Sequence, residues 1–251
     1  MITLYDFDTR LPGRGLSRYT WRVRLALNIK GLEHKTEWLQ YSEIEQRLKE
    51  LDIPPSEVAT DGSARYTIPA IYDASTNAKI SDSTKILKYL DEAYPETPQL
   101  GAIPGLPAGV LLAAFEQGFQ NALRPVWALI APTVIAHLDG ESADKYRKTF
   151  ETKVKVSVEA FLENAQLQAG LWAKGEEALG DVGAWFRNSS GHGPWVMGAK
   201  ITLPDIILGS GIAWFVAAVG EDSEKWKRLA QWDEGRWAVL WGQIKPYSQV
   251  Y

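Results

Sequence analysis

The residues able to perform chemistry in this 251-residue sequence are few. It contains no cysteine, which excludes disulfides, thiolate metal sites and a protein thiol as nucleophile. Its histidines, His34, His137 and His192, are too dispersed to suggest a metal cluster, and no metal centre is predicted. The sequence also lacks a serine-hydrolase elbow, a P-loop and a dinucleotide-binding glycine pattern. If the protein acts through a thiol, a bound ligand must therefore supply it.

Ser17 lies just before the N-terminus of a predicted helix. The stretch LPGRGLSRYTWRVRLALNIKG, residues 11 to 31, leads from a turn into a helical pattern over 20–30, and Gly31 fits its end. Serine is favoured at helix N-caps, and Thr20 is a second candidate for the cap. None of the histidines lies near Ser17 in sequence to act as a base, so its hydroxyl is expected to donate a hydrogen bond rather than attack.

Two further pairs of residues have groups that could bind a ligand. Ile68-Pro69 lies in YTIPAIYD, residues 66–73, where a proline marks the edge of a predicted strand because it cannot donate to the ladder. Asp82-Ser83 begins the helical stretch DSTKILKYLDEAY, and both residue types accept hydrogen bonds from free helix N–H groups. Helix capping alone would explain the second pair.

The elements that must position these residues follow a simple order. Strands are predicted at 2–7, 34–40, 66–73 and around Ile80, alternating with helices at 20–30, 42–51 and 82–94. A stretch rich in proline and glycine, 95–107, follows as a linker. Helical periodicity then covers 108–138, 142–168, 172–187, 203–219, 223–231 and 233–242. We therefore predict an α/β domain over 1–94 and an all-helical domain over 108–251.

The composition argues against nucleic acid and membranes as binding partners. The formal net charge is −4, with 45% apolar and 23% charged residues, which gives no overall positive field for nucleic acid or anionic membranes. No N-terminal stretch has a leader pattern, and no apolar run is long enough to span a bilayer. We expect a cytoplasmic protein that binds neither nucleic acid nor membrane.

The order of elements, with the linker and the helical second half, resembles the soluble glutathione transferases. The most specific segments are TIPAIYD (67–73), ISDSTKILKYLDEAYP (80–95) and WVMGAKITLPDIILGS (195–210). In the last segment Thr202 and Asp205 form a predicted capping box that serves folding. SRYTWRVRLALNIKG, from Ser17, resembles the first-helix motif of the fungal-specific A class, related to bacterial glutathione-dependent β-etherases, with Arg18 where that motif has proline. The resemblance implies a thioredoxin-like N-terminal domain.

This resemblance implies a glutathione site. In the family the proline corresponding to Pro69 is cis, which leaves the backbone of Ile68 free to bind an extended peptide ligand. Asp82 would bind the γ-glutamyl ammonium, and Ser83 with the helix N-terminus would bind the carboxylate. Gln40 lies where the family contacts the glycyl end. A trans proline at a strand edge is the alternative interpretation of Pro69.

Ser17 would then stabilise the glutathione thiolate. Lowering a thiol pKa from about 8.5 to about 6.5 requires about 2.7 kcal/mol in favour of the thiolate. A helix N-terminus contributes about 0.3 to 1 kcal/mol, whereas a hydroxyl hydrogen bond to a charged acceptor adds about 1.5 to 3 kcal/mol. The hydroxyl is therefore the larger contribution. The alternative is that Ser17 only caps the helix.

A second substrate would bind between the domains. The predicted hydrophobic site consists of Leu16, Phe115, Phe119, Leu123 and Trp127. Core packing is the competing interpretation for each of them. Eight of the eleven tryptophans follow residue 170, and these also fit either a core or an aromatic pocket.

The function implied is a serine-type glutathione transferase. It would use the bound thiolate for conjugation, peroxide reduction or aryl-ether cleavage on hydrophobic aromatic substrates. A ligandin-like carrier of aromatic or polyphenolic molecules is the alternative, and an interaction module of the same fold is a third possibility. A homodimer is expected from the resemblance and because symmetric dimers are the commonest oligomers.

Overall fold

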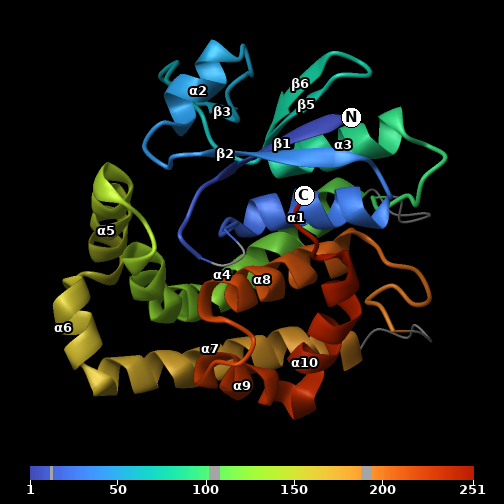
Figure 1. Ribbon diagram of the computed structural model, residues 1–251. Helices are drawn as coiled ribbons and strands as arrows, with labels where there is room; N and C mark the ends of the chain where they lie inside the picture. The colour runs from blue at the N-terminus through green and yellow to red at the C-terminus, as the bar shows by residue number, and fades with distance from the viewer. Residues whose placement is uncertain (12–13, 102–107, 188–193) are drawn as a thin grey trace.

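The computed structural model of the protein describes residues 1–11, 14–101, 108–187 and 194–251. A small sheet with three helices forms the N-terminal domain, and longer helices form a second domain beneath it (Figure 1). This architecture confirms the predicted fold class. Residues 102–107 of the predicted linker, and His192, lie outside the described residues.

The sheet is mixed and has the strand order β2-β1-β5-β6. β1 pairs in parallel with β2 and antiparallel with β5, and β5 pairs antiparallel with β6. Every residue of β1 is buried, because the strand is central and covered on both faces. The strands are β1 (Ile2–Phe7), β2 (His34–Leu39), β5 (Ala70–Asp73) and β6 (Ala78–Ser81).

The strands of this domain differ from the prediction in two places. The strand expected over 66–73 begins only after Pro69, which has no N–H to give to a ladder. A short hairpin of β3 (Glu57–Val58) and β4 (Ala64–Arg65) lies where no strand was predicted. Strands of two exposed residues leave no alternation to detect in a sequence.

Three helices complete the N-terminal domain: α1 (Arg18–Ile29), α2 (Ile44–Glu50) and α3 (Ser83–Ala93). α1 lies between the sheet and the helical domain (Figure 1). Arg24 of α1 forms a fully buried ion pair with Asp6 of β1, at 2.9 Å between Nη2 and Oδ2. Its Nη1 also donates to Thr36 Oγ1 of β2 at 2.7 Å. Burial raises the pKa of Asp6 to about 6 against the opposing charge of Arg24. This pair fixes α1 against the central strands.

Asp73, the last residue of β5, anchors α3. It accepts hydrogen bonds from Ser75 Oγ at 2.6 Å, from Tyr89 Oη at 2.7 Å and from Tyr94 Oη. Burial raises the pKa of Asp73, but the hydrogen bonds outweigh burial and hold it below the ordinary 3.8. α3 is thereby fastened to the sheet at its far end, while Asp82 and Ser83 stand at its start.

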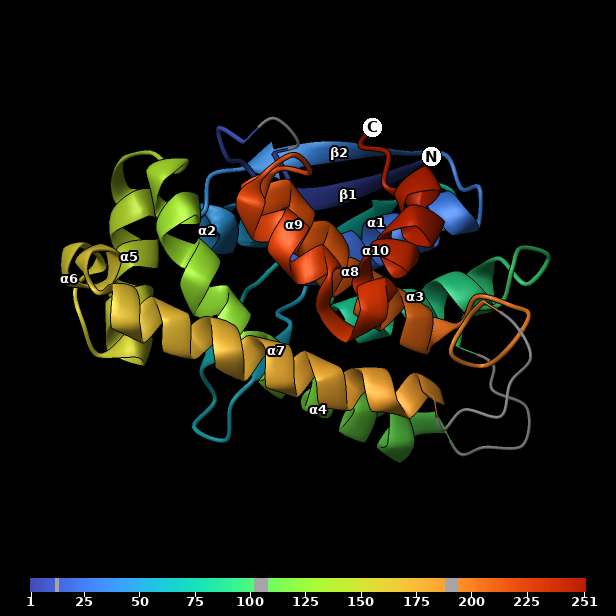
Figure 2. The same ribbon diagram turned by 90° about the horizontal axis from the view of Figure 1, so that it is seen from below.

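The second domain is entirely helical among its described residues. Seen from below, α7 runs beside α4, with α9 and α10 next to them (Figure 2). The helices are α4 (Ala108–Ala136), α5 (Gly140–Val154), α6 (Val158–Glu163), α7 (Ala165–Arg187), α8 (Leu203–Val219), α9 (Glu224–Ala230), α10 (Trp232–Ile244) and a 3-10 turn, η1 (Lys245–Tyr247).

The helices predicted at 142–168 and 172–187 are divided differently in the structure. The first is broken after Val154, where Lys155 adopts a left-handed backbone with φ of 66°. Ser157 then caps α6 by accepting from the Ala160 N–H at 3.1 Å, and α7 begins at Ala165. The break contains no glycine or proline, so the local sequence carries no strong stop signal.

The capping box predicted at the start of α8 is confirmed. The backbone N–H and the hydroxyl of Thr202 each donate to Asp205 Oδ2 at 2.8 Å, and the Val196 N–H donates to Oδ1 at 2.7 Å. α8 is buried along almost its whole length. Asp205 therefore serves the folding of a central helix.

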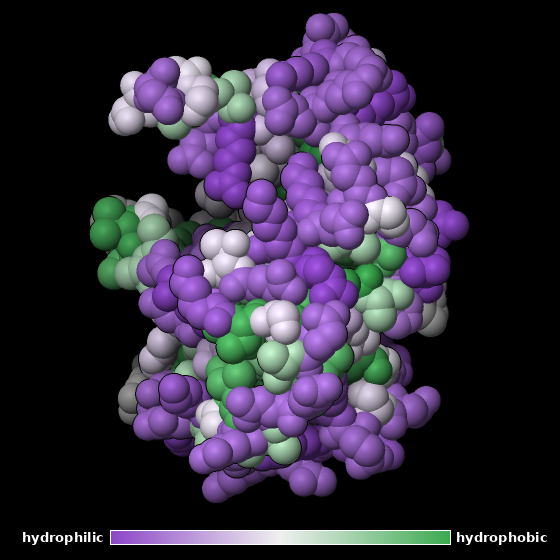
Figure 3. Space-filling view, turned by 90° about the vertical axis from the view of Figure 1, so that its left-hand side faces the viewer, coloured by the Kyte–Doolittle hydropathy of each residue, from purple (hydrophilic) through white to green (hydrophobic). Residues whose placement is uncertain are grey.

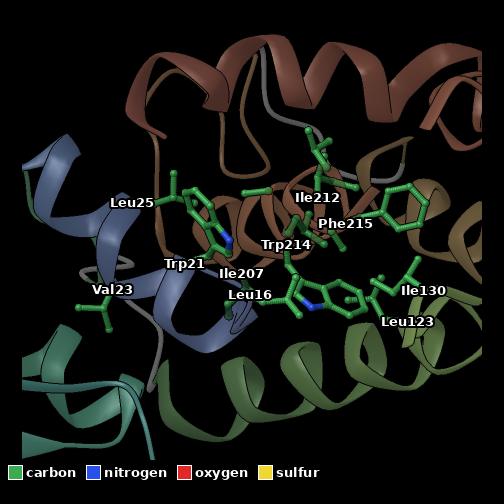
Figure 4. Close-up of a cluster of buried hydrophobic side chains, with 14 of the residues drawn as sticks. Leu16, Trp21, Val23, Leu25, Leu123, Ile130, Ile207, Ile212, Trp214 and Phe215 are labelled. Carbon is green, nitrogen blue, oxygen red and sulfur yellow. The ribbon is translucent and has the colours of Figure 1, made fainter. Parts of the chain in front are cut away.

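Apolar side chains from α1, α4 and α8 form one continuous core between the domains. In Figure 4, Trp21 of α1 faces Ile207 of α8, and Leu16 lies near Trp214. Six of the eight tryptophans after residue 170 are buried, which favours the core interpretation for them: Trp172, Trp214, Trp226, Trp232, Trp237 and Trp241.

A buried ion pair also crosses the domain interface. Arg22 of α1 donates from Nη1 to Glu116 Oε1 of α4 at 3.0 Å, with side-chain exposures of 4% and 21%. The same nitrogen lies 3.5 Å from Ser83 Oγ, and Gln120 donates to the same Glu116 oxygen at 2.9 Å. The two domains are thus joined beside the start of α3.

Asp73→Asn is expected to make the free energy of unfolding depend less on pH in the acid range. The pKa of Asp73 is lower in the folded protein than its unfolded value of about 3.9. The stabilisation by the carboxylate is therefore complete above that pH and lost as the pH falls through the folded pKa. The free energies of unfolding of wild type and variant, from urea denaturation, should differ by a constant amount above pH ~5 and converge as the pH falls below ~4. Asp222→Asn, at an exposed position, is the control, and a constant gap for Asp73→Asn would contradict this account.

Arg22 and Glu116 should show strong energetic coupling. Removing either charge leaves its partner without compensation in a mostly buried place. A double-mutant cycle with Arg22→Gln and Glu116→Gln should give a coupling energy of about 1–3 kcal/mol in unfolding experiments. The exposed pair Glu45–Lys49 is the matched control and should give about 0.3–0.5 kcal/mol. Equal coupling in both pairs would rule out the buried bridge as a structural link.

Candidate functional site

Two clefts meet at the interface between the domains. The larger, about 990 Å³, lies among the start of α1 and helices α4, α5 and α7. The smaller, about 540 Å³, lies over the Ile68-Pro69 turn and the start of α3. Tyr19, Arg65 and Gln120 line both, so the two spaces are adjacent. On the side of the molecule that carries α5 and α6, apolar residues gather among hydrophilic ones (Figure 3).

The smaller cleft brings together four residues predicted for the glutathione site. Ile68, Pro69, Asp82 and Ser83 all line it. The Ile68-Pro69 peptide bond is cis, as the resemblance implied. In the described part of the chain, the N–H and C=O of Ile68 make no hydrogen bond with the protein. Their backbone groups are therefore available to an extended ligand.

Asp82 and Ser83 are held by the start of α3. Asp82 Oδ1 accepts from the N–H groups of Thr84 and Lys85, each at 3.0 Å, so the predicted capping role is confirmed. Its backbone has φ of 80°, a region that favours glycine, and the two cap bonds offset that strain. Ser83 is buried and touches Arg22. Oδ2 of Asp82 has no partner among the described residues and can accept from a ligand.

One carboxylate in the smaller cleft lacks a basic partner. The cleft is lined by Glu57, Asp82, Glu116 and Arg65. Glu116 pairs with Arg22 and Glu57 with Arg65, so among the described residues Asp82 is left to attract a ligand that presents an ammonium group. The buried hydroxyl of Ser83 and its N–H, which donates to no group among the described residues, offer a complementary place for a carboxylate.

Ser17 is the N-cap of α1 and also lines the larger cleft beside Leu16. Its Oγ accepts from the Thr20 N–H at 3.2 Å, so the cap is Ser17 and not Thr20. The residue is half-buried. Within the described residues its hydroxyl donates to no protein group, so its hydrogen is available to a ligand. Capping and donation are compatible, because capping uses a lone pair and donation uses the hydrogen.

Aromatic side chains form the wall of the larger cleft. The ring of Tyr41 lies 5.5 Å from Phe7 and 5.9 Å from Tyr146, measured between centroids. Trp127 donates from Nε1 to Tyr146 Oη at 3.2 Å. Leu16, Leu123 and Trp127, all predicted for this site, line the cleft. An apolar, aromatic space suits a flat hydrophobic molecule.

The two tyrosines of this wall are neutral phenols. Burial raises the pKa of Tyr146 to about 12, and burial also raises the pKa of Tyr41. Tyr146 Oη accepts from Trp127, and its own hydrogen makes no hydrogen bond within the described part of the protein. Tyr146 can therefore donate a hydrogen bond to an oxygen of a bound molecule.

Three predicted residues lie away from both clefts. Phe119 is 2% exposed and packs against Gly211 of α8, where an added Cβ would lie 2.7 Å from its ring. Phe115 packs against Trp185 of α7 at 5.1 Å. Gln40 is exposed after β2 and lines neither space. The phenylalanines are displaced because α4 turns that stripe towards α7 and α8.

Sequence reasoning missed Gln120 and Arg124 of α4 and the tyrosines of the aromatic wall. Gln120 and Arg124 line the larger cleft at helical spacing of three and four residues from the predicted Leu123 and Trp127. That pattern was a usable signal. Tyr146 comes from α5 and meets the others only through the fold, so no local pattern identifies it.

Among the described residues, no group of three or more histidine, cysteine, aspartate or glutamate side chains is arranged to hold a metal ion. Within the same ranges, no helix has both the length and the apolar character needed to cross a membrane.

Comparison with known proteins agrees with this geometry. The families described as glutathione S-transferase N-terminal domain and C-terminal domain match residues 16–93 and 110–247. A glutathione S-transferase of Ceriporiopsis subvermispora, CsGST63524, solved in complex with glutathione, is 32% identical over 100% of this chain and 98% of its own, with a TM-score of 0.88.

Two other relatives are similar. Glutathione transferase GSTFuA3 from Phanerochaete chrysosporium is also 32% identical, covers 100% of this chain and 98% of its own, and has a TM-score of 0.88. The glutathione S-transferase-like protein ustS of Aspergillus flavus is 23% identical over 96% of this chain and 88% of its own length. With both family regions matched and these identities over the full length, the chain belongs to the glutathione S-transferase family.

Proposed function

We propose that this protein is a serine-type glutathione transferase. Glutathione binds in the smaller cleft, its thiol lies at Ser17, and a hydrophobic aromatic substrate binds in the larger cleft. The observation that carries the proposal is the adjacency of the two spaces, which share Tyr19, Arg65 and Gln120 in their lining. A cosubstrate and a substrate bound on either side would meet beside the hydroxyl of Ser17.

The smaller cleft matches the γ-glutamyl end of glutathione group by group. Asp82 offers a free carboxylate oxygen to the ammonium, and Ser83 with the start of α3 offers donors to the carboxylate. The backbone of Ile68 can pair with the peptide part of the ligand. Two relatives from Ceriporiopsis subvermispora, of 32% and 28% identity, were crystallised with glutathione, which supports the assignment.

Ser17 would donate to the glutathione sulfur and favour its thiolate. The N-terminus of α1 adds about 0.3 to 1 kcal/mol in the same direction, and the hydroxyl about 1.5 to 3 kcal/mol. The thiolate then attacks an electrophilic carbon, forming a C–S bond while the leaving group departs with the electron pair. In aryl-ether cleavage the leaving group is a phenolate, and in peroxide reduction the thiolate attacks oxygen instead.

A ligandin-like carrier is the second candidate. The larger cleft is lined with aromatic side chains, and its volume of about 990 Å³ is at the upper end for small-molecule sites. Such a space would hold polyphenols without any reaction. Turnover with several electrophiles separates the two functions, because a carrier binds aromatic ligands and does not consume glutathione.

Three properties remain predictions. We expect a homodimer in solution, which sedimentation analysis would test. We also expect a cytoplasmic protein. The division into domains at 1–94 and 108–251 predicts that protease cleavage in the connecting stretch leaves two fragments of these sizes.

Asp82→Asn should weaken glutathione binding about tenfold, because the amide keeps the cap but loses the charge that faces the ligand ammonium. Isothermal titration calorimetry with glutathione measures the change. Asp222→Asn removes an exposed charge elsewhere and should leave the affinity unchanged. If wild type binds no glutathione, the proposed function is wrong.

Ser17→Ala should raise the pKa of bound glutathione by about 1–2 units, since it removes a hydrogen bond of about 1.5–3 kcal/mol to the thiolate. Glutathione affinity itself should change little. Ultraviolet absorbance of the thiolate against pH gives the pKa, and turnover of a chlorodinitrobenzene gives the rate.

The control for Ser17→Ala is Ser157→Ala. Both serines accept one backbone hydrogen bond at a helix start, but Ser157 caps α6 and lines neither cleft. Both variants should lose about 0.5–2 kcal/mol of stability, while only Ser17→Ala moves the thiol pKa. An unchanged thiol pKa in Ser17→Ala would leave the serine as a cap alone.

A further inference from the structure

The larger cleft is cationic. It is lined by Arg18, Arg65, Arg124 and Lys153, and no aspartate or glutamate is among the described residues that line it. The whole chain has more acidic than basic residues, 31 against 27. Four cations around one apolar space are therefore a local departure from the composition of the protein. In the neighbouring cleft, by contrast, two of the three lining carboxylates are paired with arginines.

Most of these cations lack an acidic partner. In the described part of the chain, Arg18, Arg124 and Lys153 form no ion pair. Arg65 has a single long pair, 3.9 Å, with the exposed Glu57. Their charges are not neutralised within the protein, so they are available to a ligand.

Two of the cations are held in place by aromatic rings. The Arg18 guanidinium lies 4.8 Å from the Tyr19 ring centroid and donates to its hydroxyl at 2.9 Å. Lys153 Nζ lies 5.1 Å from the ring centroid of Trp127. These contacts limit the freedom of long side chains, which lowers the entropy cost of binding an anion. Arg18 comes from α1 and Lys153 from α5, so the charges flank the cleft from two elements.

The tyrosines in the wall do not cancel this charge. Burial raises the pKa of both Tyr41 and Tyr146, so both stay neutral near neutral pH. The free hydrogen of Tyr146 points to a third kind of contact, a hydrogen bond to an anionic oxygen.

We propose that the larger cleft selects aromatic compounds that carry a carboxylate. The ring packs against Trp127 and Tyr146, and the carboxylate lies beside Arg18, Arg124 and Lys153. The inference rests on the proposed function in that the selected compound is the second substrate. With its carboxylate held among these cations, the compound presents its uncharged edge to the thiol.

A matched pair of substrates tests the proposal. Chlorodinitrobenzoate and chlorodinitrobenzamide have the same ring and leaving group, and glutathione displaces chloride from both. We expect wild type to favour the carboxylate in kcat/KM after correction for the uncatalysed rates. Added salt should reduce that preference, because the cations are partly exposed.

Variants that each remove one positive charge identify the cations responsible for the preference for the carboxylate substrate. Arg18→Gln, Arg124→Gln and Lys153→Gln should each lower the ratio of kcat/KM for carboxylate over carboxamide about three- to tenfold. Lys200→Gln, an exposed cation that does not line the cleft, should leave the ratio unchanged. If Arg18→Gln slows both substrates equally, its charge acts on the thiolate and not on the substrate, which contradicts the proposal for that residue.

A binding experiment without glutathione separates this inference from the proposed function. Naphthoate should quench tryptophan fluorescence at lower concentration than naphthamide, and Lys153→Gln should reduce the difference about three- to tenfold. Loss of glutathione binding with this preference intact would overturn only the transferase. Equal affinity for naphthoate and naphthamide, with equal rates for the substrate pair, would overturn the charge selection.

Discussion

The buried ion pair between Asp6 and Arg24 is the constraint on which the rest of the site depends. It holds α1 against β1, and it also fixes the chain that leads into the helix. A Cβ added to Gly15 would lie 2.9 Å from Asp6 Oδ2 and 3.5 Å from Arg24 Nη2, so only glycine passes this point without displacement. Trp21 donates from its indole to the Gly15 carbonyl at 3.0 Å. The position of Ser17, two residues on, follows from these contacts.

Arg22, the other buried arginine of α1, makes its contacts on a different side of the helix. Arg22 faces the helical domain, where it meets Glu116, while Arg24 faces the sheet. Within one turn of α1, Arg24 therefore holds the helix to the sheet of its own domain, and Arg22 holds it to the helical domain. Because both clefts lie between the domains, their shape depends on this joint. The start of α3 belongs to the same arrangement through the contact of Arg22 with Ser83.

The sequence was informative where a residue's local chemistry decides its structure. Pro69 ends a ladder, and Asp82 caps a helix, whatever surrounds them, so both could be placed and a common site expected. Side chains that depend on helix rotation could not be placed. Phe119 has the same helical spacing in the sequence whether it faces a cleft or α8, and only packing decides. Tyr146 reaches the cleft because α5 packs beside α4, and this packing leaves no local pattern in the sequence.

The cap at the start of α1 has a further consequence for the serine hydroxyl. Because Ser17 Oγ accepts the Thr20 N–H, one of its lone pairs is committed and the hydroxyl can no longer rotate freely. Its hydrogen must point away from the helix. Accepting a hydrogen bond also polarises the O–H, which strengthens the bond that it donates in turn. The helix thus orients its own donor before any ligand arrives, and little reorganisation remains when a sulfur anion forms beside it.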